Sequence, residues 1–101
     1  MRAMDDACDR MFDLAIEFLR KARAANPRDS GIHRGLAAAL ALRGDLDEAK
    51  AELAESIKLD PKVNSLATLR ASAPWITNPP LWALREKTVN VGLRRAGFPD
   101  E

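Results

Sequence analysis

Hydrophobic residues in the middle of the chain recur every three or four positions, which is the period of an amphipathic α-helix. Two such stripes follow one another, the first made of Ile32, Leu36, Ala39 and Leu40 and the second of Leu46, Ala49, Leu53 and Ile57, with the small Ser56 on the same face. Ser30 is expected to cap the first helix, which ends near Leu42 at the C-cap Gly44. The pattern therefore predicts a helical hairpin.

The second helix of this hairpin carries its own start and stop signals. Asp45 is expected to open it, with Glu48 completing a capping box, and Pro61 closes it. A related stripe precedes the hairpin at an offset of 34 residues, because Ala15, Leu19, Ala22 and Pro27 recur as Ala49, Leu53, Ser56 and Pro61. A repeat of this length indicates helical hairpins that stack on one another.

The flanking units depart from this pattern. In the first, one helix containing Phe12 is expected, preceded by a short, weak helical run over 4–9. In the third, a helix from Val63 stops at Pro74, a proline link follows, and a final helix is expected from about Pro80 to Arg95. The expected apolar face of that last helix comprises Leu81, Leu84, Thr88 and Val91, with Trp82 and Val89 beside it.

These elements predict an all-α, single-domain stack of antiparallel hairpins with about five helices and a C-terminal capping helix. Its units are a degenerate first unit over 1–29, a complete unit over 30–63, and a partial unit with proline link and cap over 64–101. Solenoids need such end pieces with one polar side.

The second unit resembles a tetratricopeptide repeat. In that register His33 stands at the usual Trp position, Leu36 at Leu, Ala37 at Gly and Leu40 at Tyr, and Gly44, Ala49, Leu53, Ser56 and Pro61 fill the later positions. The resemblance implies a non-catalytic module that binds proteins. The tail, over 65–74 and 91–101, resembles the C-terminal end of repeat regions in bacterial class III adenylate/guanylate cyclases and some transcriptional regulators. That implies a regulatory region of a signalling protein, without cyclase activity.

Composition and charge argue against several classes of partner and site. Sixteen basic and fifteen acidic side chains leave a net charge of +1, which gives no general attraction to nucleic acid or to an anionic membrane. No apolar run is long enough to span a bilayer, and no signal peptide is expected, so a cytoplasmic location is predicted. The single cysteine, Cys8, excludes an internal disulfide, and the single histidine, His33, has no second ligand at metal-binding spacing. No cofactor, metal or catalytic residue is predicted.

The predicted functional surface is the concave groove lined by the first helix of each hairpin. Its residues are Arg34, Gly35, Ala38, Ala41, Leu42, Thr68, Leu69 and Ser72. A shallow, alanine-lined groove suits the apolar face of a partner helix, supplied by another protein, by the last helix of this chain or by a second copy. Trp75 and Trp82 are expected to attach the last helix to the stack, with contact to a partner peptide as the alternative.

Self-association is the alternative function. Fewer than three complete repeats leave apolar edges, and a homodimer through the first unit would cover Phe12, Leu14 and Phe18.

Overall fold

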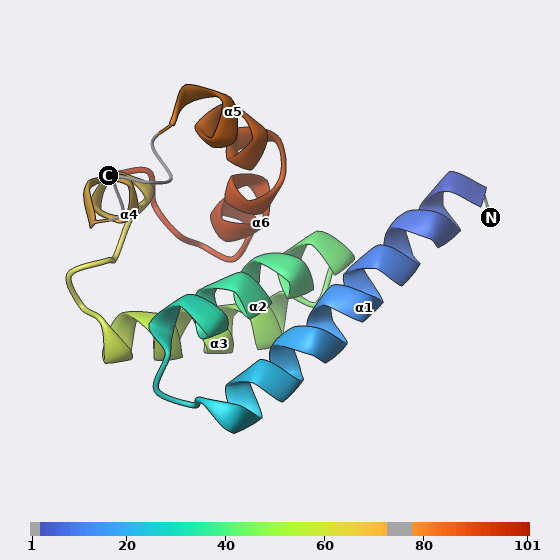
Figure 1. Cartoon of the computed structure of the whole chain (residues 1–101), viewed down its shortest axis with the longest axis horizontal. Coiled ribbons are helices and arrows are strands. Elements are labelled where there is room, and N and C mark those ends of the chain that lie inside the picture. The colour runs from blue at the N-terminus through green and yellow to red at the C-terminus, as the bar shows by residue number, and fades with distance from the viewer. Residues whose placement is uncertain (1–2, 73–77) are drawn as a thin grey trace.

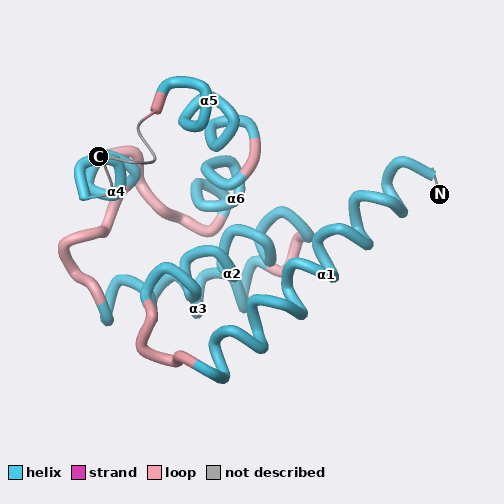
Figure 2. The backbone as a smooth tube through the Cα atoms, in the orientation of Figure 1, coloured by secondary structure: helices cyan, strands magenta, loops and turns pink. Residues whose placement is uncertain are grey.

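Six helices and no strand make up the part of the chain that this computed structural model describes, residues 3–72 and 78–101. They are α1 (Ala3–Ala25), α2 (Ser30–Arg43), α3 (Leu46–Leu59), α4 (Leu66–Ser72), α5 (Pro79–Lys87) and α6 (Val89–Arg95). The predicted all-α hairpin stack with a C-terminal helical end is confirmed. Figure 1 and Figure 2 show α1 running alongside α2 and α6 on the other side of α2, with α5 beyond α6. Helix α3 also packs against α2.

The first unit differs from the prediction. Instead of a weak run over 4–9 followed by a second helix, α1 is one continuous helix of 23 residues. No glycine or proline occurs between Ala3 and Ala25, so nothing in the sequence interrupts the backbone hydrogen bonds of the helix. The unit therefore contributes a single long helix, whose N-terminal end extends beyond α2 (Figure 1).

Helix α2 is capped at its start by a side chain and at its end by the backbone conformation of a glycine. Its N-cap is Asp29, not Ser30 as predicted, because the Asp29 carboxylate accepts hydrogen bonds from the amides of Gly31 and Ile32. At the other end Gly44 adopts φ 101°, and the amide of Asp45 bonds back to the carbonyl of Leu40. Only glycine takes this left-handed conformation without strain, so the predicted C-cap is confirmed.

The predicted capping box at the start of α3 does not form. Asp45 is the N-cap residue, but its carboxylate bonds to Arg43 instead of a helix amide. Glu48 reaches across to Arg20 of α1, with 2.6 Å between the charged atoms. Asp45 and Glu48 therefore bond to residues of α2 and α1. The first turn of α3 is helical without a hydrogen bond from the Asp45 side chain.

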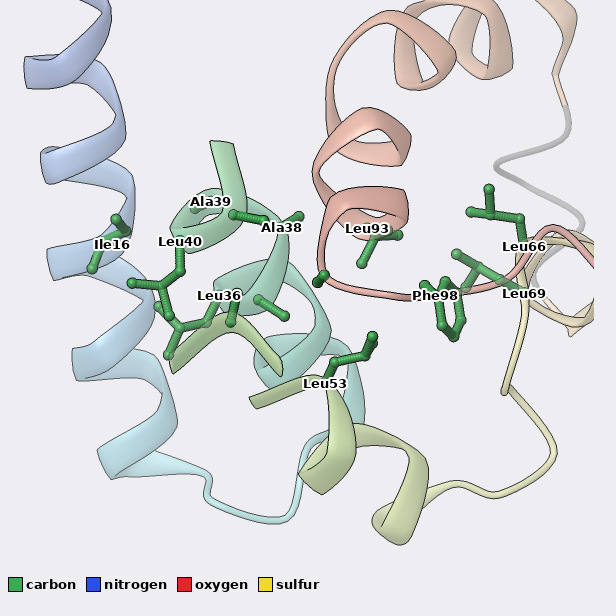
Figure 3. Packing of buried hydrophobic residues seen from close by; sticks show 14 of the residues in the cluster. Ile16, Leu36, Ala38, Ala39, Leu40, Leu53, Leu66, Leu69, Leu93 and Phe98 are labelled. Carbon is green, nitrogen blue, oxygen red and sulfur yellow. The ribbon is translucent and has the colours of Figure 1, made fainter. Parts of the chain in front are cut away.

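Helix α2 is the centre of the molecule. It packs against α1, α3 and α6, so every residue from Leu36 to Ala41 is buried. A helix covered on three sides is expected to be apolar nearly all round, and small alanines let three neighbours approach it closely. Figure 3 shows Leu36 and Leu40 near Ile16 of α1, while Ala38 points toward Leu93 of α6.

The C-terminal tail after α6 packs against α4 and hydrogen-bonds to its first turn. The amides of Leu66 and Ala67, in the first turn of α4, donate to the carbonyls of Pro99 and Asp100 at 2.9 Å. Phe98 is 2% exposed and lies beside Leu66 and Leu69 (Figure 3). These contacts satisfy amides that a helix start otherwise leaves without partners.

The predicted final helix is two helices that meet at Thr88. The Thr88 backbone has φ −126° and ψ −91°, and its hydroxyl donates to the carbonyl of Leu84 at 2.9 Å. The predicted apolar face is also wrong in part, because Leu84 is 58% exposed, while Asn90, Gly92 and Leu93 are buried. The break redirects the chain so that α6 turns its own face onto α2.

Candidate functional site

The predicted groove residues do not line one open surface. Ala38, Ala41 and Leu69 are buried, Arg34, Gly35, Leu42 and Thr68 are half-buried, and Ser72 is exposed. The part of the groove around Ala38 of α2 is covered by α6. A Cβ placed on Gly92 of α6 would lie 2.4 Å from the backbone oxygen of Ala38. The last helix of the chain therefore occupies the position that a partner helix was expected to take on this face.

The α4 part of the predicted groove is bound up in local contacts. Thr68 and Ser65 cap α4 reciprocally, because the amide of each donates to the hydroxyl of the other. The hydroxyl of Ser72 donates to the carbonyl of Leu69 at 2.9 Å. Helix α4 is not among the elements with extensive contacts to α2, so its residues do not complete the α2 surface.

Arg34 is half-buried, so it is not freely exposed to a partner peptide as predicted. The pKa of its guanidinium is lowered, mainly by burial and further by the positive charge of Arg85 on α5, although nearby Asp60 and Asp29 act to raise it. The Nε atoms of Arg34 and Arg85 are both buried, and within the described part of the chain neither has a hydrogen-bond partner. Two arginines from α2 and α5 thus share one side of the molecule, where they repel one another.

Three of the predicted groove residues do line an open apolar pocket, on the side of α2 that faces α1. This pocket has a volume of about 300 Å³ and is formed by α1, α2 and the α5–α6 corner. Its residues are Phe12, Ala15, Leu19, Gly35, Ala38, Ala39, Leu42, Thr88 and Val89. We call it the α1–α2 pocket. Gly35 widens it, since the position of a Cβ there is 3.6 Å from the side chain of Leu19.

An apolar stripe on α1 runs beside the mouth of this pocket. Met11, Leu14 and Phe18 are 68%, 67% and 70% exposed, and their spacing of three and four residues places them on one face of the helix. Ala15 is exposed and lines the pocket, and it directly follows Leu14. Leu14 and Phe18 of the predicted dimer surface belong to this exposed stripe together with Met11, whereas Phe12 is half-buried in the pocket. Extending the 3–4 spacing back from Phe18 would have identified Met11.

A cluster of polar side chains joins α1, α2 and α3 near the loop that contains Pro27. His33 is 5% exposed, with Nε2 at 2.7 Å from the carbonyl oxygen of Pro27 and Nδ1 at 3.3 Å from Glu52. Glu52 also accepts a hydrogen bond from Arg23 of α1, and it is 6% exposed. Each partner comes from a different element, so this cluster ties α1, α2 and α3 together.

The remaining candidate features give no second site. No group of three or more His, Cys, Asp or Glu within 3–72 and 78–101 is arranged to hold a metal ion. None of the described helices is both long and apolar enough to cross a membrane. Trp82 is half-buried and packs under the guanidinium of Arg70, 5.0 Å from the ring centre, which links α5 to α4. Trp75, its predicted companion, lies outside the described residues.

Comparison with known families agrees with this arrangement. A family model described as a tetratricopeptide repeat matches residues 9–73, which is more than half of the chain. No curated protein and no solved structure matches the chain significantly. The matched region runs from α1 to the end of α4 and contains the complete α2–α3 hairpin. Such repeats generally mediate protein–protein interactions. The chain belongs to the tetratricopeptide repeat family.

Proposed function

We propose that this chain is a non-catalytic module that binds an apolar helical segment of a partner protein at the α1–α2 pocket. The observation that carries the proposal is the open apolar cavity of about 300 Å³ beside the exposed stripe of Met11, Leu14 and Phe18. Exposed apolar surface of this kind commonly marks a protein interaction site. Large side chains on one face of a partner helix would insert into the pocket and along the stripe.

Selection of peptides tests this proposal. A displayed library of amphipathic helical peptides is selected against the full chain, and the affinities of the selected peptides are measured by calorimetry. Leu42→Glu places a charge at the half-buried wall of the pocket, where it cannot keep its hydration if an apolar side chain enters. We expect binding to Leu42→Glu to be at least tenfold weaker, a difference of about 1.4 kcal/mol.

A matched variant controls for an added charge. Leu84→Glu changes a leucine that is 58% exposed on α5 and does not line the pocket. It should bind the selected peptides as the wild type does. Equal affinity of all three proteins for every selected peptide would show that the pocket is not the binding site.

The setting of the module is proposed from its tail. The resemblance of residues 65–74 and 91–101 to the ends of cyclase-associated repeat regions supports a regulatory or scaffolding role in a bacterial signalling protein in the cytoplasm. In that role the module would present the pocket to a protein partner, with no contact to nucleic acid or membrane. Co-purification from a bacterial lysate with a signalling enzyme, lost in Leu42→Glu and kept in Leu84→Glu, is the expected result.

Self-association is the second candidate function. It is favoured by the stripe of Met11, Leu14 and Phe18, because three large apolar side chains about two-thirds exposed on one helix face stabilise a protein only when they are covered. Sedimentation of the chain over a range of concentrations distinguishes a dimer from a monomer.

A further inference from the structure

We propose that α1 pairs with α1 of a second copy of this chain in an antiparallel, two-fold symmetric coiled coil, with Met11 of each copy opposite Leu14 of the other. The proposal rests on the second candidate function above and specifies its interface. Met11 and Leu14 of the exposed stripe are then covered by the same two residues of the second copy, turned end for end, and Phe18 extends beyond them along the seam.

The spacing of the stripe is that of a coiled-coil seam. Met11, Leu14 and Phe18 follow one another by three and four residues, which are the intervals between a and d positions of a heptad. Their exposure, about two-thirds in each case, shows that α2 does not use this face. Ile16, which is 2% exposed, packs on the opposite side of α1 against the core. A second helix can therefore cover the stripe without displacing α2.

The charges beside the stripe select the orientation. Arg10 and Glu17 are both exposed, and because they are one heptad apart they lie on the same flank of the seam. In an antiparallel pair with Met11 opposite Leu14, Arg10 of one copy comes beside Glu17 of the other. The two-fold axis repeats this ion pair, so one interface gains two of them. In a parallel pair, Arg10 would instead lie beside Ala15, and neither ion pair would form.

On the other flank of the seam, the residue beside Leu14 is small enough for the second helix to approach α1 closely. Ala15 follows Leu14 on the side away from Arg10 and Glu17, and it is exposed and small. The existing partner of Glu17 is Lys21 of the same helix, at 3.4 Å, with side chains 62% and 78% exposed. Such exposed pairs contribute little, so Glu17 can turn to a second copy at small cost.

Charge reversal tests both the partner and the orientation. The dissociation constant of the full-length chain is measured by sedimentation equilibrium at low salt for the wild type, Glu17→Arg, Arg10→Glu and the double reversal. Each single reversal turns two attractions into two repulsions, so we expect dimerisation to weaken by about tenfold. The double reversal restores opposite charges and should return the dissociation constant to near the wild-type value. Singles that leave it unchanged would overturn the antiparallel register.

The apolar contact has its own matched pair of variants. Leu14→Glu introduces two charges at the centre of the seam and should abolish the dimer, whereas Leu84→Glu on α5 should leave it intact. Because Leu14 is exposed, the helical content and melting temperature of the monomer should not fall, and circular dichroism checks this. A wild-type chain that stays monomeric at millimolar concentration overturns the proposal. Peptide binding that is sensitive to Leu42→Glu would still stand in that case, so failure of the dimer is separable from failure of the pocket.

Discussion

Gly92 of α6 lies so close to Ala38 of α2 that a Cβ on Gly92 would be 2.4 Å from the backbone oxygen and 3.0 Å from the Cα of Ala38. Backbone atoms cannot rotate away as a flexible side chain can, so the helices would have to separate. The close approach of the chain's own last helix to the central helix therefore requires glycine at position 92.

Gly92→Ala should therefore destabilise the protein, although alanine favours helices over glycine by about 1 kcal/mol. Overpacking of this kind costs about 1–3 kcal/mol. Urea unfolding measures the loss, and hydrogen exchange of the α6 amides should accelerate more than that of α3. A Gly92→Ala protein as stable as the wild type would mean that α6 does not hold this close contact in solution.

Gly35→Ala should have the opposite effect and stabilise the protein. Gly35 is also inside a helix, but its Cβ would be 3.6 Å from the nearest side-chain atom of Leu19, which is ordinary van der Waals contact. The gain in helix propensity then remains, and we expect the free energy of unfolding to rise by about 0.5–1 kcal/mol. Urea unfolding measured beside Gly92→Ala gives the comparison, and destabilisation by both would contradict the packing described for α1 and α2.

Asp29→Ala should weaken the start of α2. The variant loses the two hydrogen bonds from the carboxylate to the amides of Gly31 and Ile32, at 2.9 and 3.2 Å, which we expect to cost about 1 kcal/mol. Ser30→Ala is the matched control, because among the described residues the Ser30 hydroxyl makes no hydrogen bond, while its carbonyl accepts one from the hydroxyl of Ser56. Thermal unfolding should place Ser30→Ala within about 0.5 kcal/mol of the wild type. Equal losses of stability in the two variants would contradict Asp29 as the N-cap of α2.

The sequence predicted the α2–α3 hairpin and its glycine C-cap because these depend on local signals. Apolar spacing places the two helices, and φ 101° at Gly44 follows from the one residue type that tolerates it. The N-cap was misplaced by one residue, since Asp29 and Ser30 are both good caps and only the hydrogen bonds distinguish them.

The candidate site was harder to predict because it depends on which distant helix covers α2. The alanines of α2 indicate a close neighbour, but not whether that neighbour is α4, α6 or another protein. The break at Thr88 carries no glycine or proline signal, yet it turns α6 onto Ala38 and leaves Leu84 exposed. With that face covered, Gly35 and Leu42 line a pocket with α1 instead.

Glu52→Ala should destabilise the protein much more than Glu48→Ala. Both acids lie on α3 and bind an arginine of α1, but Glu52 is 6% exposed and also faces His33, whereas the Glu48 pair is 43% and 45% exposed. Loss of Glu52 removes the partner of the buried Nδ1 of His33 and of the half-buried Arg23, at a cost of about 1–3 kcal/mol. An exposed pair such as Glu48–Arg20 contributes less than about 1 kcal/mol. Urea unfolding of both variants measures the difference, and equal losses would contradict a buried polar cluster.

Stability in acid should depend on Glu86. Hydrogen bonds from Arg94, at 2.9 Å, and from Asn90, at 2.8 Å, lower the pKa of Glu86 in the folded chain below its ordinary value of 4.5. The unfolded chain therefore binds this proton first as the pH falls. The stabilisation is fully present above pH 4.5 and is lost as the pH falls through the lowered pKa.

Glu86→Gln should remove this contribution. Unfolding by urea between pH 7 and pH 3 should show the wild type more stable than Glu86→Gln at neutral pH, with the difference shrinking once the pH is below 4.5. The side chain of Glu86 is 37% exposed, so solvent screening keeps the effect small and added salt should reduce it further. A difference that stays constant down to pH 3, or grows as the pH falls, would show that the Arg94 and Asn90 contacts do not favour the ionised carboxylate.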